Sequence, residues 1–247
     1  MNKPFSSDAI KLWAITAMLI DHIAWLFIPL ESPLGLASHL IGRTTIPIMC
    51  FGVAEGYRFS HDRRRYALRL LLFAALSHLP FVYFETGSIP SDLPALLLSF
   101  QHTGVIWPLF LALAALALQD QKGLSLWIKV LGTLGLCALG LFGDWYFFPV
   151  LWARIFHRQR ENPPKMILFF VLSALPLVLD YPLSFLLNAP GSPLPLWSFF
   201  QAGLFLAIPL LLGQNGKRSR SKVLKWGFYA FYPAHLLILG FLRQLFS

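Results

Sequence analysis

Charged residues and cysteines are scarce in this chain of 247 residues. Only 13% of the residues are Asp, Glu, Lys or Arg, whereas soluble domains contain roughly 25%. The two cysteines, Cys50 and Cys137, both lie inside apolar segments, so neither a disulfide nor a cysteine metal site is expected. No P-loop, GxGxxG, GxSxG or HExxH motif is present. The scarcity of charge and cysteine excludes a soluble enzyme, a secreted disulfide scaffold and a disordered chain. The missing motifs leave ATP hydrolysis, dinucleotide chemistry and zinc proteolysis without support.

Apolar residues make up 57% of the chain, and the mean hydropathy is +0.64. They form long blocks, and a helix needs about 20 apolar residues to cross the hydrocarbon of a bilayer. The pattern predicts an all-α, polytopic transmembrane helical bundle that forms a single domain over residues 1–247. About nine spans are expected: 9–30, 36–57, 66–85, 95–118, 124–143, 144–157, 166–187, 195–213 and 225–245. The fifth and sixth spans abut at Gly143 and are interpreted either as two crossings or as a re-entrant pair.

The basic residues predict how the chain is oriented in the membrane. All Lys and Arg residues except Arg43 and Arg243 fall on one side if the spans are counted from the N-terminus. By the positive-inside rule this side is cytoplasmic, which places the N-terminus inside and the C-terminus outside. We therefore expect a multi-pass protein of the bacterial inner membrane that contacts lipids. The net charge of +9 is assigned to orientation, and nucleic acid is not an expected partner.

Ionisable residues inside the expected spans are candidates for function, because each costs about 2.5–3.5 kcal/mol on insertion. Asp21 and His22 interrupt the first apolar run, which favours a retained helix over a cleaved signal peptide. Their side chains point about 100° apart on a helix, so one interpretation has His22 facing a cavity while Asp21 pairs with Arg43. His39 shares a helix face with Arg43 at i,i+4 spacing. Further such residues are Glu55, His78, His102 and His235.

Several of these residues also have simpler interpretations. A lone intramembrane histidine such as His78 or His102 is typical of a hydrogen-bonded group between helices. His39 fits a position at the membrane surface, and Glu55 fits the polar end of its span. No two of these intramembrane residues stand at the i,i+3 or i,i+4 spacing of a His and carboxylate ligand pair, so no metal is expected.

Three segments resemble the TraX family of integral membrane proteins, which includes the acetylase of F-type conjugative pilin. They are DAIKLWAITAMLIDHIAWLF at residues 8–27, IGRTTIPIMCFGVAEGYRFSHDRRRYALRLLLFAALSHLPF at 41–81 and KWGFYAFYPAHLLIL at 225–239. The resemblance is strong over about a third of the chain and rests on hydropathy between residues 86 and 224. This chain departs from the family pattern at His78 and around His102.

The resemblance implies an acetyltransferase that moves an acetyl group from acetyl-CoA to an amine, such as the N-terminus of a pilin subunit. Its catalytic candidates are His22 as base or transient acyl carrier, Asp21 to orient it, and Arg43 to stabilise the oxyanion or pair with Asp21. His235 would form a second polar wall. The expected pocket also includes Glu55, Tyr57, His78, His102 and Tyr232.

Acetyl-CoA is anionic, so cytoplasmic arginines are candidates for holding its phosphates. The expected cofactor-binding residues are Arg58, Arg64, Arg65 and Arg69. Positive-inside charge alone accounts for this cluster equally well. The acceptor also stays open, because a family supports many substrates: a saccharide or a small secreted metabolite are alternatives. The rival from another class is a non-enzymatic transporter or pilus-assembly component.

Overall fold

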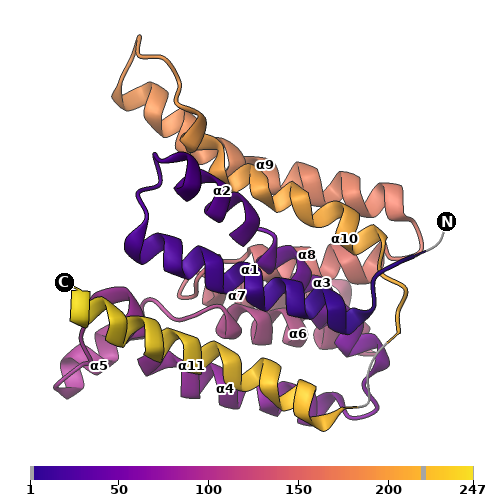
Figure 1. The fold of residues 1–247 in the computed structure, drawn as a ribbon. Coiled ribbons are helices and arrows are strands. Elements are labelled where there is room, and N and C mark those ends of the chain that lie inside the picture. The colour runs from indigo at the N-terminus through magenta and orange to yellow at the C-terminus, as the bar shows by residue number, and fades with distance from the viewer. Residues whose placement is uncertain (1–2, 218–220, 247) are drawn as a thin grey trace. The chain divides into compact units, whose positions relative to one another are not determined.

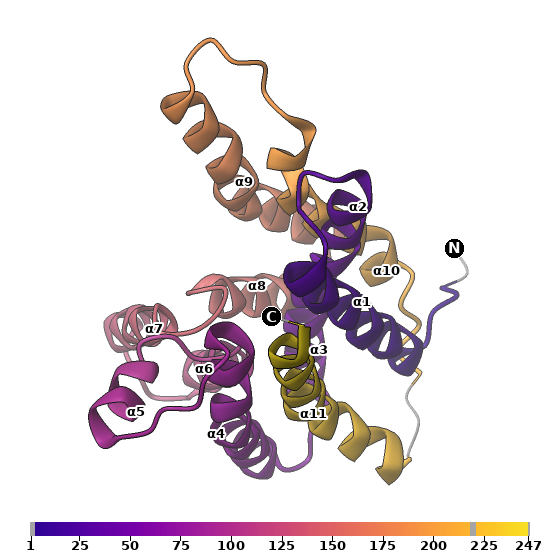
Figure 2. The same cartoon turned by 60° about the vertical axis from the view of Figure 1, so that its left-hand side comes forward.

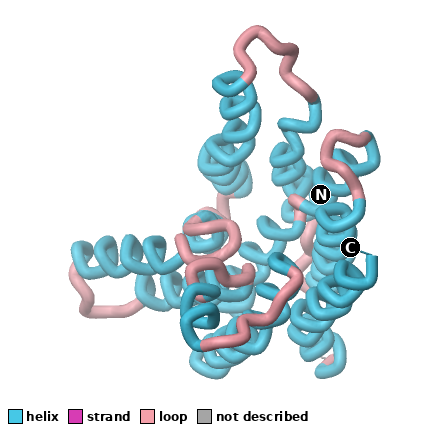
Figure 3. The backbone as a smooth tube through the Cα atoms, turned by 90° about the vertical axis from the view of Figure 1, so that its left-hand side faces the viewer, coloured by secondary structure: helices cyan, strands magenta, loops and turns pink. Residues whose placement is uncertain are grey.

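The computed structural model describes residues 3–217 and 221–246 and is helical throughout, with two isolated β-bridges. Figure 3 shows helices joined by loops, and no strand element occurs in the described part of the chain. The all-α prediction is confirmed. The elements are α1 Ser7–Phe27, α2 Pro33–Gly42, α3 Thr45–Phe59, α4 Arg63–Thr86, α5 Leu93–Ser99, α6 Ile106–Asp120, α7 Leu126–Gly140, α8 Phe148–Arg158, α9 Pro163–Asn188, the 3-10 helix η1 Leu196–Ala207, α10 Ile208–Leu212 and α11 Lys222–Phe246.

Polar side chains cap the starts of many of these helices. In each case the capping side chain accepts a hydrogen bond from the backbone N–H three residues later, which satisfies one of the free donors of the first turn. The caps are Ser6, Ser32, Asp62, Asp92, Ser125 and Asn162. The short polar segments that separate the apolar blocks in the sequence therefore also fix where helices begin.

Four helical segments are long and apolar enough to cross a membrane. They are Ser7–Phe27, Pro33–Phe59 (α2 and α3 taken together), Arg63–Thr86 and Pro163–Asn188. They match the expected spans 9–30, 36–57, 66–85 and 166–187. Three further apolar helical segments are shorter: Ile106–Asp120, Leu126–Gly140 and Leu196–Leu212. The described helices thus fit a membrane protein, while the count of nine crossings stays a prediction.

Three of the expected spans differ from the helices observed, and the span 36–57 is divided between α2 and α3. The span 95–118 is divided, since α5 ends at Ser99 and α6 begins at Ile106. Between them the Thr103 N–H donates to Phe142 O over 2.7 Å and the Asp144 N–H donates to Thr103 O over 2.7 Å, so the chain bonds to a neighbouring turn instead of continuing a helix. The span 144–157 becomes α8, which has 11 residues and rises about 16 Å, roughly half of the hydrocarbon thickness.

The chain divides into two compact units, which we describe separately. Unit 1 comprises residues 1–49 and 159–219, and α3 continues from it into unit 2. In unit 1, α1 packs on α2, and η1 packs on both α2 and α9. The close approach of η1 to α2 requires a glycine at position 203, because an added Cβ there would lie 2.1 Å from Leu40 O. The N-terminal segment is held by hydrogen bonds from Phe5 N–H to Gly213 O, 3.0 Å, and from Asn215 N–H to Phe5 O, 2.8 Å.

Unit 2 comprises residues 50–158 and 220–247, and its helices α4, α6, α7, α8 and α11 pack as neighbours. The helices α4 and α11 lie side by side in Figures 1 and 2. Phe73 stacks on Tyr229 in the first half of both helices, and the Tyr83 hydroxyl donates to Gln244 Oε1 over 2.8 Å near their ends. The two helices are therefore parallel, and their basic first turns lie at the same end of the unit.

Candidate functional site

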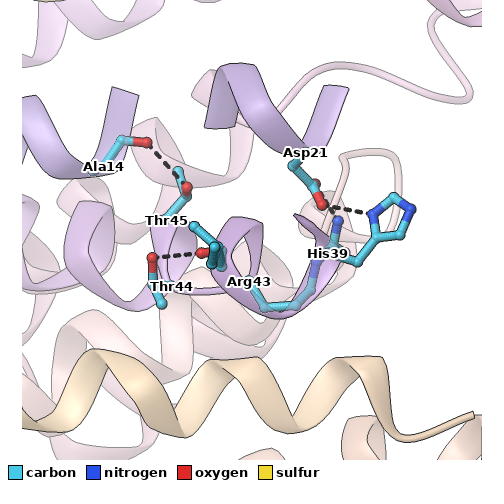
Figure 4. Close-up of polar contacts among 7 residues, drawn as sticks. Ala14, Asp21, His39, Arg43, Thr44 and Thr45 are labelled. Carbon is cyan, nitrogen blue, oxygen red and sulfur yellow. Dashed lines mark hydrogen bonds and ion pairs between the residues drawn. The ribbon is translucent and has the colours of Figure 1, made fainter. Parts of the chain in front are cut away.

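A buried carboxylate on α1 forms the centre of the site in unit 1. Asp21 Oδ1 lies 2.8 Å from His39 Nδ1, and Asp21 Oδ2 pairs with Arg43 Nη2 (Figure 4). An ionised carboxylate accepts hydrogen bonds and cannot donate them, so the Nδ1 atom of His39 carries the proton in this pair. Asp21 thus binds two donors that come from α2 and its C-cap.

His39 is fully buried, with 0% of its surface exposed. Its ring lies 4.3 Å from the Trp25 ring and 5.9 Å from the Phe200 ring, centroid to centroid. With Nδ1 bonded to Asp21, the second ring nitrogen, Nε2, is buried and has no hydrogen-bond partner among the described residues. An imidazole with a carboxylate on one nitrogen and an unprotonated second nitrogen is the arrangement of a general base.

The approach of α1 to α2 depends on a residue without a side chain. A Cβ added at Gly42 would lie 2.3 Å from both Cβ and Oδ1 of Asp21. Two threonines after α2 hold the next turn: Thr45 Oγ1 donates to Ala14 O over 3.1 Å, and Trp13 Nε1 donates to Thr44 Oγ1 over 3.0 Å. These contacts fix where Asp21 lies relative to the end of α2.

Arg43 brings the positive charge of the site. Its guanidinium carbon lies 5.8 Å from the Trp25 ring centroid and 5.5 Å from the Phe200 ring centroid. Aromatic faces at this distance attract a guanidinium through the charge distribution of the ring. The expected pairing of Asp21 with Arg43 is present in the structure.

His22 and His39 take different positions relative to Asp21. His22 is half-buried on α1, and the hydrogen bonds of Asp21 go to His39 and Arg43. The sequence analysis noted the i,i+4 spacing of His39 to Arg43 but did not include His39 among the catalytic candidates. The burial of His39 depends on Trp25 and Phe200, and Phe200 lies far along the chain.

The other candidate histidines, apart from His22, lie in unit 2. His78 Nε2 lies 2.8 Å from Ser99 Oγ, and its ring stacks on Phe100. On α11, His235 Nδ1 donates to Phe231 O over 2.8 Å. His102 is exposed in the connection between α5 and α6.

The remaining pocket candidates are also in unit 2. The Tyr232 hydroxyl accepts a hydrogen bond from the Val105 N–H, 3.1 Å. Glu55 and Tyr57 are buried on α3, and the Tyr57 hydroxyl accepts from Arg63 Nη1 over 2.8 Å. The unit thus places these residues in helix contacts, while their role in a substrate pocket stays a prediction.

The four arginines expected to bind the acyl donor differ in environment. Arg58, Arg64 and Arg65 are exposed, and Arg65 Nε lies 2.9 Å from Asp62 Oδ2. Arg69 is half-buried on α4. Arg218 and Arg220, two further basic residues of the chain, lie outside the described residues. Within the described residues, no group of three or more His, Cys, Asp or Glu side chains is arranged to hold a metal ion.

The fold and the site define a helical protein with membrane-length helices and a buried Asp–His–Arg cluster. The profile of the family described as TraX protein matches residues 6–243, and the chain belongs to the TraX family. It is 29% identical over 238 residues to the probable fimbrial assembly protein FimC, serogroup H1, of Dichelobacter nodosus, with 96% of each chain covered. No solved structure matches the chain.

Proposed function

We propose that this protein is a membrane-embedded acetyltransferase that moves the acetyl group of acetyl-CoA to an amine, with the N-terminus of a pilin subunit as acceptor. The observation that carries this proposal is the buried Asp21–His39 pair, in which Nε2 of His39 has no partner. Membership of the TraX family supports the activity through the family's pilin acetylase. The name of the FimC relative supports a link to fimbriae.

The chemistry follows from the two nitrogens of His39. The acceptor amine attacks the thioester carbonyl, a C–N bond forms, the C–S bond breaks and coenzyme A leaves as the thiol. His39 Nε2 takes the proton from the amine and returns it to the departing sulfur. Asp21 holds Nδ1–H and stabilises the imidazolium between these steps. A free α-amine has a pKa of about 7.7–8.0, so a neutral imidazole is a sufficient base.

Substrates must reach a nitrogen that has no exposed surface. Of the two rings beside His39, Phe200 is 1% exposed while Trp25 is 45% exposed. Movement of the Trp25 side chain would uncover Nε2 at the smallest cost in buried contacts. We therefore place the entrance for the reacting groups at Trp25.

The proposed location is the bacterial inner membrane, with about nine crossings and a cytoplasmic N-terminus. The parallel course of α4 and α11 supports this topology, because it brings the basic residues that precede both helices to the same end of unit 2. Acetyl-CoA would then be bound from the cytoplasm.

The decisive experiment uses the purified protein in nanodiscs with radiolabelled acetyl-CoA and a panel of pilin N-terminal peptides, other amines and saccharides. His39→Asn keeps an amide donor near the position of Nδ1 but has no atom in place of Nε2. We expect it to lose at least about 100-fold of the transfer rate, the scale of general-base catalysis, while the protein stays folded.

His22→Asn is the matched variant on the neighbouring helix. If His22→Asn removes transfer and His39→Asn does not, the base is His22, as the sequence analysis predicted. Transfer to saccharides alone would change the acceptor class. Absence of both acetyl-CoA binding and turnover with every acceptor would favour a second candidate, a non-enzymatic assembly component, which the name of the FimC relative also fits.

A further inference from the structure

Two basic segments that lie far apart in the sequence meet where α4 and α11 pack. Phe73, one turn after Arg69, stacks on Tyr229 with ring centroids 5.0 Å apart and lies 6.2 Å from the Trp226 ring. Lys225 immediately precedes Trp226 and is one turn before Tyr229. The two helices lie side by side (Figure 2), and because they run parallel this register brings Lys225 close enough to Arg69 for their charges to interact.

Arg69 is held in a fixed position without a carboxylate. Its guanidinium carbon lies 5.7 Å from the Tyr66 ring centroid, and the side chain is close enough to Tyr229 for the two groups to interact electrostatically. Its Nε atom is buried and has no acceptor among the described residues. A buried donor without an acceptor is unfavourable, so the position favours a ligand that supplies an acceptor.

Two neighbouring arginines on α4, unlike Arg69, lie close to a carboxylate. Arg65 Nε lies 2.9 Å from Asp62 Oδ2, and Arg63 Nη1 lies 3.9 Å from Asp120 Oδ2. In the described part of the chain, neither Arg69 nor Lys225 forms an ion pair with a carboxylate. The positive-inside rule explains why basic residues lie at this end, but it does not require a half-buried arginine next to an unpaired lysine.

We propose that Arg69 and Lys225 form a binding site for a phosphate ester. A guanidinium binds two phosphate oxygens at once, and a lysine ammonium adds a point charge. Two sources share this chemistry: the phosphates of coenzyme A, an assignment that rests on the proposed function, and the headgroup of an anionic lipid. Of the four arginines expected to bind acetyl-CoA, the proposed site includes only Arg69. It adds Lys225 from α11.

The test measures ligand binding without acetyl transfer. In nanodiscs of phosphatidylcholine, coenzyme A is titrated into the parent, Arg69→Gln, Lys225→Gln and the control Arg64→Gln, whose side chain is exposed on the same helix. Loss of one charge-assisted phosphate contact predicts at least a tenfold rise in Kd for Arg69→Gln and Lys225→Gln. The control is expected to change Kd less than twofold. Lys225 is exposed, so Lys225→Gln remains informative if Arg69→Gln does not fold.

A second arm titrates phosphatidylglycerol into the same nanodiscs and follows retained lipid by native mass spectrometry. Loss of retained lipid in Arg69→Gln and Lys225→Gln, with unchanged coenzyme A binding, assigns the site to a lipid headgroup. Parent-like behaviour of both variants in both arms overturns the proposal. Failure of acetyl transfer alone does not affect this result, because both arms measure binding and neither contains an acceptor.

Discussion

At the scale of single residues, the buried carboxylate of Asp21 accepts hydrogen bonds from two side chains, those of His39 and Arg43. Asp21→Asn replaces one acceptor oxygen with an N–H and leaves the Arg43 charge without a counter-ion. Breaking a buried pair from one side costs about 3–5 kcal/mol, so we expect a loss of that size in the free energy of unfolding, measured by denaturant titration in detergent. Asp180→Asn, at an exposed position, is the control. An equal effect of both changes would contradict the pairing.

Gly42 gives a second prediction at this scale. Gly42→Ala puts a methyl group 2.3 Å from the Asp21 side chain, so the carboxylate or α2 must shift. We expect at least about a tenfold loss of acetyl transfer, because a shift of about 1 Å at a catalytic group can cost 100-fold. Gly52→Ala is the control, since nothing lies within 4 Å of its added Cβ. Similar activities of the two variants would show that the approach of α1 to α2 does not position the site.

At the scale of helices, hydropathy predicted where apolar blocks lie but not where they break. The block 36–57 is divided at Arg43 and Thr44, where Thr44 Oγ1 donates to Ile41 O over 2.7 Å. A hydropathy window sums side chains and does not register such local hydrogen bonds. The same limit applies to the site: Asp21 and Arg43 were identifiable as costly charges, whereas the burial of His39 requires the packing of η1.

The C-terminal helix provides the prediction at this scale. Arg243 Nη1 donates to the carbonyls of Phe84, 3.0 Å, and Glu85, 2.7 Å, which belong to the last turn of α4. Arg243→Met keeps much of the side-chain volume and removes both donors. We expect a destabilisation of about 1–3 kcal/mol in thermal unfolding followed by circular dichroism. Arg243→Lys should lose less, and identical melting of all three proteins would show that the contact contributes nothing.

At the scale of the whole molecule, the two exceptions to the positive-inside pattern have structural partners. Arg43 pairs with Asp21, and Arg243 binds the end of α4. Each of these two arginines therefore has its partner within its own unit. The orientation proposed above rests on the remaining basic residues of the sequence.

This orientation predicts labelling from defined sides of the membrane. In a background with Cys50→Ala and Cys137→Ala, Ser88→Cys in the loop after α4 should react with an impermeant maleimide added outside intact spheroplasts. His61→Cys, in the loop before α4, should react only after the membrane is opened. Both positions are exposed, so accessibility within the protein does not limit either reaction. The reverse pattern would place Arg69 and Lys225 on the outside, away from cytoplasmic acetyl-CoA, and would leave anionic lipid as the ligand of that site.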